Sequence, residues 1–205
     1  MSVRIYVEGG GPSKGKNAAI KCRQAFSLFF DKLLASRKYR PHLVASGART
    51  EAYNDFTNAV ASKQYANDKL FLLVDSETAV PSQTTAKDHL RLRDGWTFTN
   101  NVSNDQIHMM VQCMEAWFMA HRDVVAEYYD GGFSPNSLPN NPNIEAINKK
   151  DILEGLKNAT RQTKKKGYDK GTDAFAILGS LDPNLVCEAS PRAAQLRASL
   201  LSSLT

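Results

Sequence analysis

The chain has 205 residues, of which 42% are hydrophobic, enough to bury the core of one domain with a small appendage. Its formal net charge is +5, and its three cysteines (Cys22, Cys113, Cys187) lack the spacing of a zinc site. The apolar stretch over 107–120 is interrupted by polar residues and is shorter than the ~20 residues of a membrane span, and no signal peptide is visible. We therefore expect a cytoplasmic protein with reduced thiols and no membrane partner.

The first part of the chain alternates predicted strands and helices. Residues 3–7, 42–45 and 70–74 have strand patterns, and apolar positions at helical spacing predict helices over 17–37 and 49–62. The run FLLV within 70–74 is typical of a parallel strand buried on both faces. A further strand is predicted over 107–112, followed by a helix from Cys113 toward Tyr129. This alternation predicts an α/β fold, a compact parallel sheet flanked by helices.

The last third of the chain begins with a break in the pattern. Residues 131–143, GGFSPNSLPNNPN, contain three prolines and four asparagines, which predicts a loop without regular structure. Helical patterns follow over 151–162, 173–178 and 191–201. We therefore expect an α/β core over 1–130, a loop over 131–150, and a basic helical extension over 151–205 that packs on the core.

Positive charge is concentrated between residues 148 and 170. This segment has eight basic and three acidic residues, and the difference, 8 − 3 = +5, equals the excess of the whole chain. Such a patch is typical of a protein that binds a polyanion, although a solvated helix face has the same pattern. The candidate nucleic-acid contacts in it are Lys164, Lys165, Lys166 and Lys170.

Acidic residues follow two of the predicted strands. Glu8 ends the first strand, and Asp75 and Glu77 follow the buried run in LFLLVDSE. Because positions i and i+2 share a face of a strand, Asp75 and Glu77 are expected to point to one place beyond the sheet. Ligands of open α/β sheets bind at that edge, and oxygen ligands of this kind favour Mg²⁺ or Mn²⁺. The alternative is ordinary polar residues at strand ends.

Glu115 is the only charge within MMVQCMEAWFMA. An ionised carboxylate in apolar surroundings is costly unless it is paired, hydrogen-bonded or bound to metal, which makes Glu115 a candidate catalytic residue. A glutamate in the first turn of a helix is also favoured by the helix dipole, so an ordinary structural position stays open.

The segment VEGGGPSKGKN (7–17) has two interpretations. It follows the phosphate-binding pattern G-x-x-x-x-G-K-[ST] through its second lysine, but Asn17 stands where a hydroxyl that binds Mg²⁺ is required. In the other interpretation, the glycines form a turn that lets Glu8 project and lets phosphate approach the backbone of Gly9 and Gly10. In both, two lysines would lie near bound phosphate, Lys14 and Lys16.

The order of these motifs resembles a known family. VEGGG followed by LVDSE resembles the Toprim domain of topoisomerases, primases and OLD-type nucleases. VEGGG, LLVDSE, MVQCMEAWFMA and KGYDK together resemble a family of small bacterial Toprim-like proteins of unknown function, from residue 3 to about residue 200. The resemblance implies that Glu8 is a general acid/base or metal ligand and that Asp75 and Glu77 bind Mg²⁺. Two departures are Glu77, where Toprim usually has Asp, and His121, where the family tends to have Asp; if that Asp is functional, the chain would be altered or inactive.

These features predict an Mg²⁺- or Mn²⁺-dependent phosphodiester hydrolase, a Toprim-like nuclease in which water is the nucleophile. Toprim nucleases of bacterial defence often act beside an ATPase, which by analogy implies nucleic acid and an ATPase as partners. Two other classes stay open, a nucleotide-binding protein with a phosphate-binding loop and a catalytically silent module that binds nucleic acid.

Overall fold

A computed structural model describes residues 2–11, 17–35 and 40–204 of the chain. Four parallel strands form one sheet in the order β2-β1-β3-β4. The strands are β1 (Val3–Glu8), β2 (His42–Gly47), β3 (Lys69–Asp75) and β4 (Ile107–Met110). The predicted α/β fold with a parallel sheet flanked by helices is therefore confirmed.

Alternation along the strands divides the core into two layers. In β3, Phe71 and Leu73 face the cluster that contains helix α1 (Ala18–Leu33), whereas Leu72 and Val74 face the other. The second cluster contains α2 (Arg49–Ala61) and α3 (Ala86–Asp94). All four of these β3 side chains are buried, as the uninterrupted FLLV run predicts.

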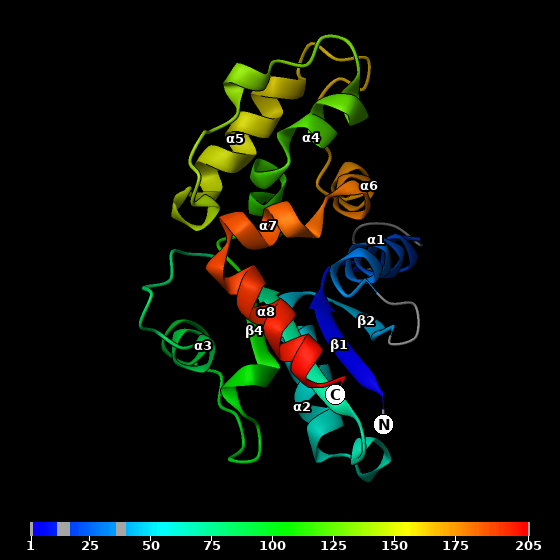
Figure 1. Cartoon of the computed structure of the whole chain (residues 1–205), viewed down its shortest axis with the longest axis vertical. Coiled ribbons are helices and arrows are strands. Elements are labelled where there is room, and N and C mark those ends of the chain that lie inside the picture. The colour runs from blue at the N-terminus through cyan, green and yellow to red at the C-terminus, as the bar shows by residue number, and fades with distance from the viewer. Residues whose placement is uncertain (1, 12–16, 36–39, 205) are drawn as a thin grey trace.

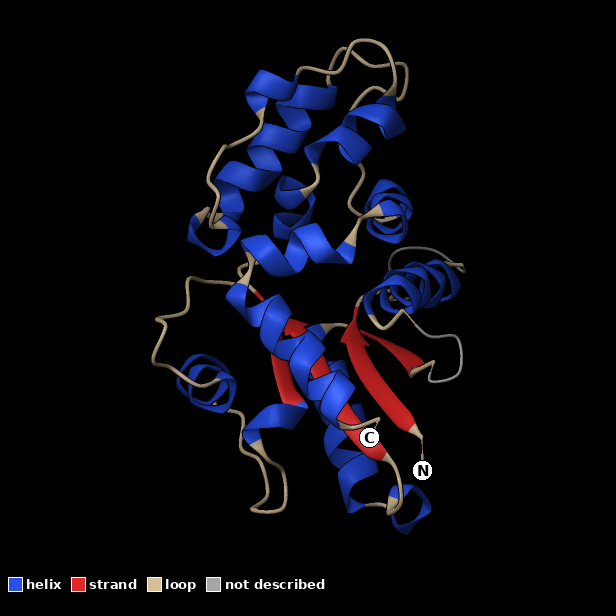
Figure 2. Ribbon diagram, viewed as in Figure 1, coloured by secondary structure: helices blue, strands red, loops and turns tan. Residues whose placement is uncertain are grey.

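The remaining helices gather beyond one edge of the sheet. These are α4 (Arg122–Tyr129), α5 (Lys149–Thr160), α6 (Thr172–Ser180) and α7 (Pro183–Ala189), while α8 (Pro191–Ser202) runs back across the sheet (Figure 1). Strand β1 points toward that helical end, so the carboxyl ends of the parallel strands face it (Figure 2). None of the described helices is both long and apolar enough to cross a membrane.

Three details differ from the sequence expectations. The helix predicted from Cys113 to Tyr129 is two elements, a 3-10 helix η4 (Met114–Ala120) and α4, because His121 leaves the helical conformation (φ −138°, ψ 62°). The segment 131–143 contains a short 3-10 turn, η5 (Pro135–Ser137), so the prediction that it holds no regular structure is wrong there. Helices α3 and α7 were not predicted. The domain boundaries at 130 and 150 stay a prediction.

Candidate metal centre

Three carboxylates meet at the carboxyl edge of the sheet. One oxygen from each of Glu8, Asp75 and Glu77 lies within 4.8 Å of the others. Glu8 is the last residue of β1 and Asp75 the last of β3, its parallel neighbour. The strand order reverses between β1 and β3, and such a switch point is where open parallel sheets bind ligands. The convergence predicted from the sequence is confirmed.

Glu77 reaches this place by a turn. Strand β3 ends at Asp75, and Glu77 has a left-handed backbone with φ 68°. The Ser76 amide donates to the Met110 carbonyl at 3.0 Å, and the Glu77 amide donates to the Gln112 carbonyl at 2.8 Å. The prediction that alternation along an extended strand groups Asp75 with Glu77 is therefore wrong. Instead, a turn held by the hydrogen bonds to Met110 and Gln112 places the Glu77 carboxylate near that of Asp75.

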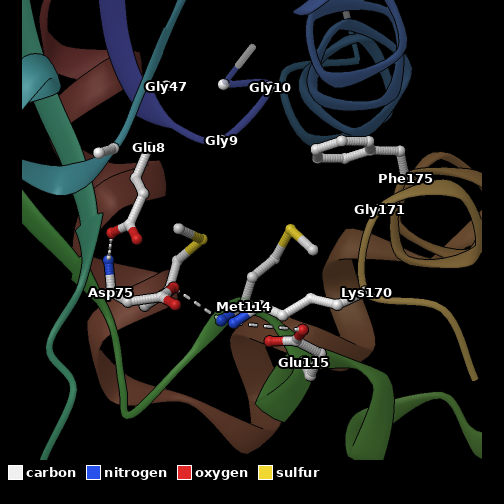
Figure 3. Close-up of a pocket in the computed structure, with 13 residues that line it drawn as sticks. Glu8, Gly9, Gly10, Gly47, Asp75, Met114, Glu115, Lys170, Gly171 and Phe175 are labelled. Atoms are coloured by element: carbon white, nitrogen blue, oxygen red, sulfur yellow. Dashed lines mark hydrogen bonds and ion pairs between the residues drawn. The ribbon is translucent and has the colours of Figure 1, made fainter. Parts of the chain in front are cut away.

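Hydrogen bonds fix the two carboxylates at the strand ends. Asp75 is only 4% exposed, and its Oδ1 accepts the backbone N–H of Met114 at 2.8 Å. Glu8 Oε2 accepts the Asp75 amide at 3.1 Å, which joins the two strands at this edge (Figure 3). Arg49 Nε donates to the Asp75 carbonyl at 2.9 Å and lies 3.5 Å from Glu8 Oε2. Both carboxylates are thus held with little freedom.

Two cations at this edge were not predicted. Lys149 Nζ lies 2.7 Å from Glu77 Oε2 and 3.9 Å from Asp75 Oδ2. Arg49 is also paired with Asp94 through both of its terminal nitrogens. Arg49 almost directly follows β2, so the rule that singled out Glu8 would have found it. Lys149 begins α5, far along the chain, and carries no local signal.

Burial and neighbouring charges shift the pKa values of the three acids. Burial, and then the charges of Glu8 and Glu115, raise the pKa of Asp75 well above its usual value. Burial also raises the pKa of Glu8, although the Asp75 amide and the charge of Arg49 oppose the shift. Burial acts in the same direction on Glu77, yet its contact with a lysine ammonium brings the pKa below the usual value. Burial is thus the largest cause of the raised pKa values of Asp75 and Glu8.

Glu115 lies outside the three-carboxylate group, although it is fully buried. Its Oε1 accepts the Tyr168 hydroxyl at 3.0 Å and lies 3.7 Å from Lys170 Nζ. Burial would lower the pKa of Lys170, but the charges of Glu115 and Asp75 raise it above the usual value. Lys170 is therefore a charged group at the site. The catalytic role expected for Glu115 stays a prediction.

A cavity of about 310 Å³ joins these residues. Glu8 and Asp75 line one side, and Glu115, Lys170 and Phe175 line the other (Figure 3). The backbone of Gly9, Gly10 and Gly11 closes it from β1.

Gly10 shows why a glycine is needed in this wall. Its φ is +75°, and a Cβ there would lie 2.7 Å from the Ala19 Cα, so any other residue would displace the start of α1. Gly9 and Gly10 are therefore at the site as expected, and whether they contact phosphate stays a prediction.

The other predicted binding residues are not part of this cavity as described. Lys14 and Lys16 lie outside the described residues, so the phosphate-binding loop is not tested. Lys164 pairs with Asp130 at 3.6 Å, and Lys165 Nζ lies 3.1 Å from the centre of the Tyr128 ring. Lys166 has φ 57° in the turn that leads to Tyr168. Contact of these three lysines with nucleic acid stays a prediction.

His121, the second departure from the family pattern, has a structural contact. Its Nδ1 accepts the backbone N–H of Asp182 at 3.0 Å, which links the break between η4 and α4 to the start of α7.

Comparison with protein-family models matches residues 11–201 to a family described as Domain of unknown function (DUF4276). Glu8 lies just before the matched range, whereas Asp75, Glu77 and Glu115 lie within it. No curated protein and no solved structure gave a significant match to the chain.

Proposed function

Because the chain belongs to the family of unknown function DUF4276, we propose its function from its own site: a phosphodiester hydrolase that depends on Mg²⁺ or Mn²⁺. The observation that carries the proposal is the convergence of Glu8, Asp75 and Glu77 within 4.8 Å at the switch point of the sheet. The resemblance of VEGGG and LVDSE to Toprim supports the same chemistry by analogy.

The donor set fits a hard divalent cation. All three ligands are carboxylate oxygens, the type that Mg²⁺ and Mn²⁺ prefer. With bonds of about 2.1 Å, one ion spans oxygens up to about 4.2 Å apart, so a separation of 4.8 Å closes with a small side-chain movement. Lys149 Nζ would have to leave Glu77 Oε2, which it contacts at 2.7 Å.

Charge supports the same conclusion. Four carboxylates, those of Glu8, Asp75, Glu77 and Glu115, meet three cations, those of Arg49, Lys149 and Lys170. Arg49 is shared with a fifth carboxylate, that of Asp94, which also pairs with a fourth cation, Arg93. With all of these groups ionised, five carboxylates face four cations, and a divalent cation would compensate the remaining negative charge.

Each residue would have a separate role in hydrolysis. Asp75, rigid and buried, would be the principal ligand, with Glu77 beside it. The ion would act as a Lewis acid on the phosphoester and stabilise developing negative charge. Glu8, with an oxygen within 4.8 Å of the other two carboxylates, is placed to exchange a proton with the attacking water or the leaving oxygen. Lys170, charged and in the cavity wall, is placed to contact a non-bridging phosphate oxygen.

Isothermal titration with Mn²⁺ tests the metal site, and a panel of single- and double-stranded DNA, RNA and a small phosphodiester tests hydrolysis. We expect wild type to bind Mn²⁺ and cleave at least one substrate. The Asp75→Asn variant should lose both activities, and Glu8→Gln should keep metal and lose turnover. Glu127→Gln, which removes an exposed carboxylate on α4, is the matched control and should behave as wild type.

The same experiment separates the other function classes. Metal binding with nucleic-acid binding and no cleavage would contradict hydrolysis and favour a silent binding module. Nucleotide binding that survives Glu8→Ala and is lost in Lys16→Ala would favour a phosphate-binding loop. An ATPase partner and a role in bacterial defence are proposals by analogy with Toprim nucleases.

A further inference from the structure

The cavity continues beyond the carboxylates into apolar surroundings. The Phe175 ring of α6 lies opposite Glu8 and Asp75 (Figure 3), and Met110, the strand partner of Asp75, and Met114 also line the cavity. The Phe175 ring lies against the glycine turn, since a Cβ on Gly9 would be 3.5 Å from its Cζ. A phosphate at the acidic end would therefore direct its attached group toward a flat aromatic ring and two thioether side chains.

One polar atom at this end has no partner. Glu115 Oε2 is buried and accepts no hydrogen bond from any described residue. An unpaired buried carboxylate oxygen is costly, and a donor supplied by a ligand would remove that cost. Because Oε1 already contacts Lys170 at 3.7 Å, a second cation here would meet like charge. A neutral N–H donor is the better complement.

We propose that this cavity binds the unpaired nucleobase next to the reacting phosphate, an inference that rests on the proposed function. The Phe175 ring would lie against the face of the base, and Glu115 would accept a hydrogen bond from an N–H of the base. A nucleobase combines flat apolar faces with N–H donors at its edge, which matches both observations. Stacking on an aromatic side chain occurs with every base, so it adds affinity without a strict sequence requirement.

The size of the cavity limits the substrate. About 310 Å³ lies at the lower end of the range for small-molecule pockets, roughly 300–1,000 Å³. It accommodates one nucleotide unit, and α6 closes the side opposite the sheet edge. A cavity of this size favours a mononucleotide ester or a single-stranded end over an intact base pair.

Three probes that share a phosphate test the proposal by isothermal titration in Mg²⁺: AMP, purine riboside 5′-monophosphate, which lacks the amino donor, and ribose 5-phosphate, which lacks the base. We expect AMP to bind roughly tenfold tighter than the purine riboside, because of the donor to Glu115. The purine riboside should bind roughly tenfold tighter than ribose 5-phosphate, because of the ring contact.

Two variants test which residue causes each difference in affinity. Phe175→Leu should weaken AMP binding and leave ribose 5-phosphate unchanged, while Glu115→Gln should reduce the preference for AMP over the purine riboside. Phe133→Leu is the matched control, because Phe133 stacks on Tyr129 at 6.2 Å and does not line the cavity.

Equal affinity of wild type for AMP and ribose 5-phosphate would overturn the nucleobase site, whether or not a variant folds. Equal affinity for AMP and the purine riboside would overturn the role of Glu115. Metal binding and hydrolysis without discrimination among the probes would contradict this inference alone. Base-dependent binding without hydrolysis would contradict only the proposed function.

Discussion

Lys149 lies with its ammonium between two of the three carboxylates of the proposed metal site. Its ammonium contacts Glu77 at 2.7 Å and lies 3.9 Å from Asp75, while its backbone N–H is held by Gln112 Oε1 at 3.1 Å. The backbone is thus fixed, and the flexible side chain is an internal counterion that a metal must displace. Having to displace Lys149 would therefore lower the affinity of the proposed metal site.

Removing that counterion should strengthen metal binding. We expect Lys149→Met to lower the Kd for Mn²⁺ on the order of tenfold, because a competing charge contact worth about 1.4 kcal/mol no longer has to break. Isothermal titration measures the effect. Lys150→Met is the control, since Lys150 is exposed and pairs only weakly with Glu154 at 3.9 Å. An unchanged or weaker affinity in Lys149→Met would refute the competition.

Prediction of individual residues succeeded where a side chain lies at the end of a strand. Glu8 and Asp75 were identified in this way, and Glu77 was identified with a wrong local reason. Lys149 and Phe175 could not be identified, because only the packing of α5 and α6 brings them to the sheet edge. Their separation from the acids along the sequence gives no information about their distance from the acids in the fold.

At the scale of elements, the strands and most helices were predictable, whereas two short helices, α3 and α7, were missed. Helix α3 buries only Ala86, His89 and Leu90, so it lacks a wide apolar stripe. Its signals are at its ends, where Thr85 caps the N-terminus and Gly95 adopts φ 70° after the last turn. Helix α7 likewise begins with Pro183 after the capping residue Asp182.

The 3-10 helix η4 is a core element whose central residue is Trp117. Trp117 is 1% exposed and stacks on Phe29 of α1 with ring centres 4.9 Å apart. We expect Trp117→Ala to lower the free energy of unfolding by ~3–5 kcal/mol, measured by urea titration. Leu92→Ala, which removes a 79% exposed side chain, should change it by less than ~0.5 kcal/mol. Near-normal stability of Trp117→Ala would show that Trp117 is not a core residue.

Strand β4 contains a buried histidine that makes stability depend on pH. Burial lowers the pKa of His108 to about 4. The hydrogen bond to the Asp105 carbonyl and the charge of Asp105 act in the opposite direction, and the charge of Arg192 lowers the pKa slightly further. The unfolded chain therefore binds a proton between pH ~6.5 and 4 that the folded chain does not. Stability is full above pH ~6.5 and falls as the pH decreases through this window.

Urea titrations at pH 7 and pH 4 test this contribution. The His108→Gln variant should lose less stability than wild type between the two values, by on the order of 3 kcal/mol, because glutamine does not titrate. Gln can still donate to the Asp105 carbonyl, which the ring of His108 contacts at 2.8 Å. His42→Gln, at an exposed position, is the control. Equal pH dependence of wild type and His108→Gln would refute the assignment.

For the whole molecule, the sheet and the edge where the acids converge were predictable from the sequence, but the packing of the helices beyond that edge was not. Continuous apolar runs identify parallel strands because both faces are buried, and the four predicted strands match within two residues at each end. How α4 to α7 pack over the edge depends on contacts between distant segments, and periodicity within each helix does not specify them.

The basic segment between residues 148 and 170 also concerns the whole molecule, because it contributes to the electrostatic field of the protein. Replacing Lys164, Lys165 and Lys166 with Gln should weaken nucleic-acid binding and flatten its dependence on salt by up to ~3 units of slope. Filter binding at several salt concentrations measures the slope. The control replaces three exposed lysines elsewhere, Lys21, Lys63 and Lys69. If both triple variants change the slope equally, the segment is not a specific contact surface.

The central claim is that Glu8, Asp75 and Glu77 form one divalent-metal site. Anomalous diffraction from crystals soaked in Mn²⁺ tests it most directly, because it locates the ion independently of activity. The predicted result is one strong peak about 2.1 Å from carboxylate oxygens of Asp75 and Glu77, with Glu8 bound directly or through water and the Lys149 ammonium displaced. No peak at the sheet edge, with Lys149 still on Glu77, would contradict the claim.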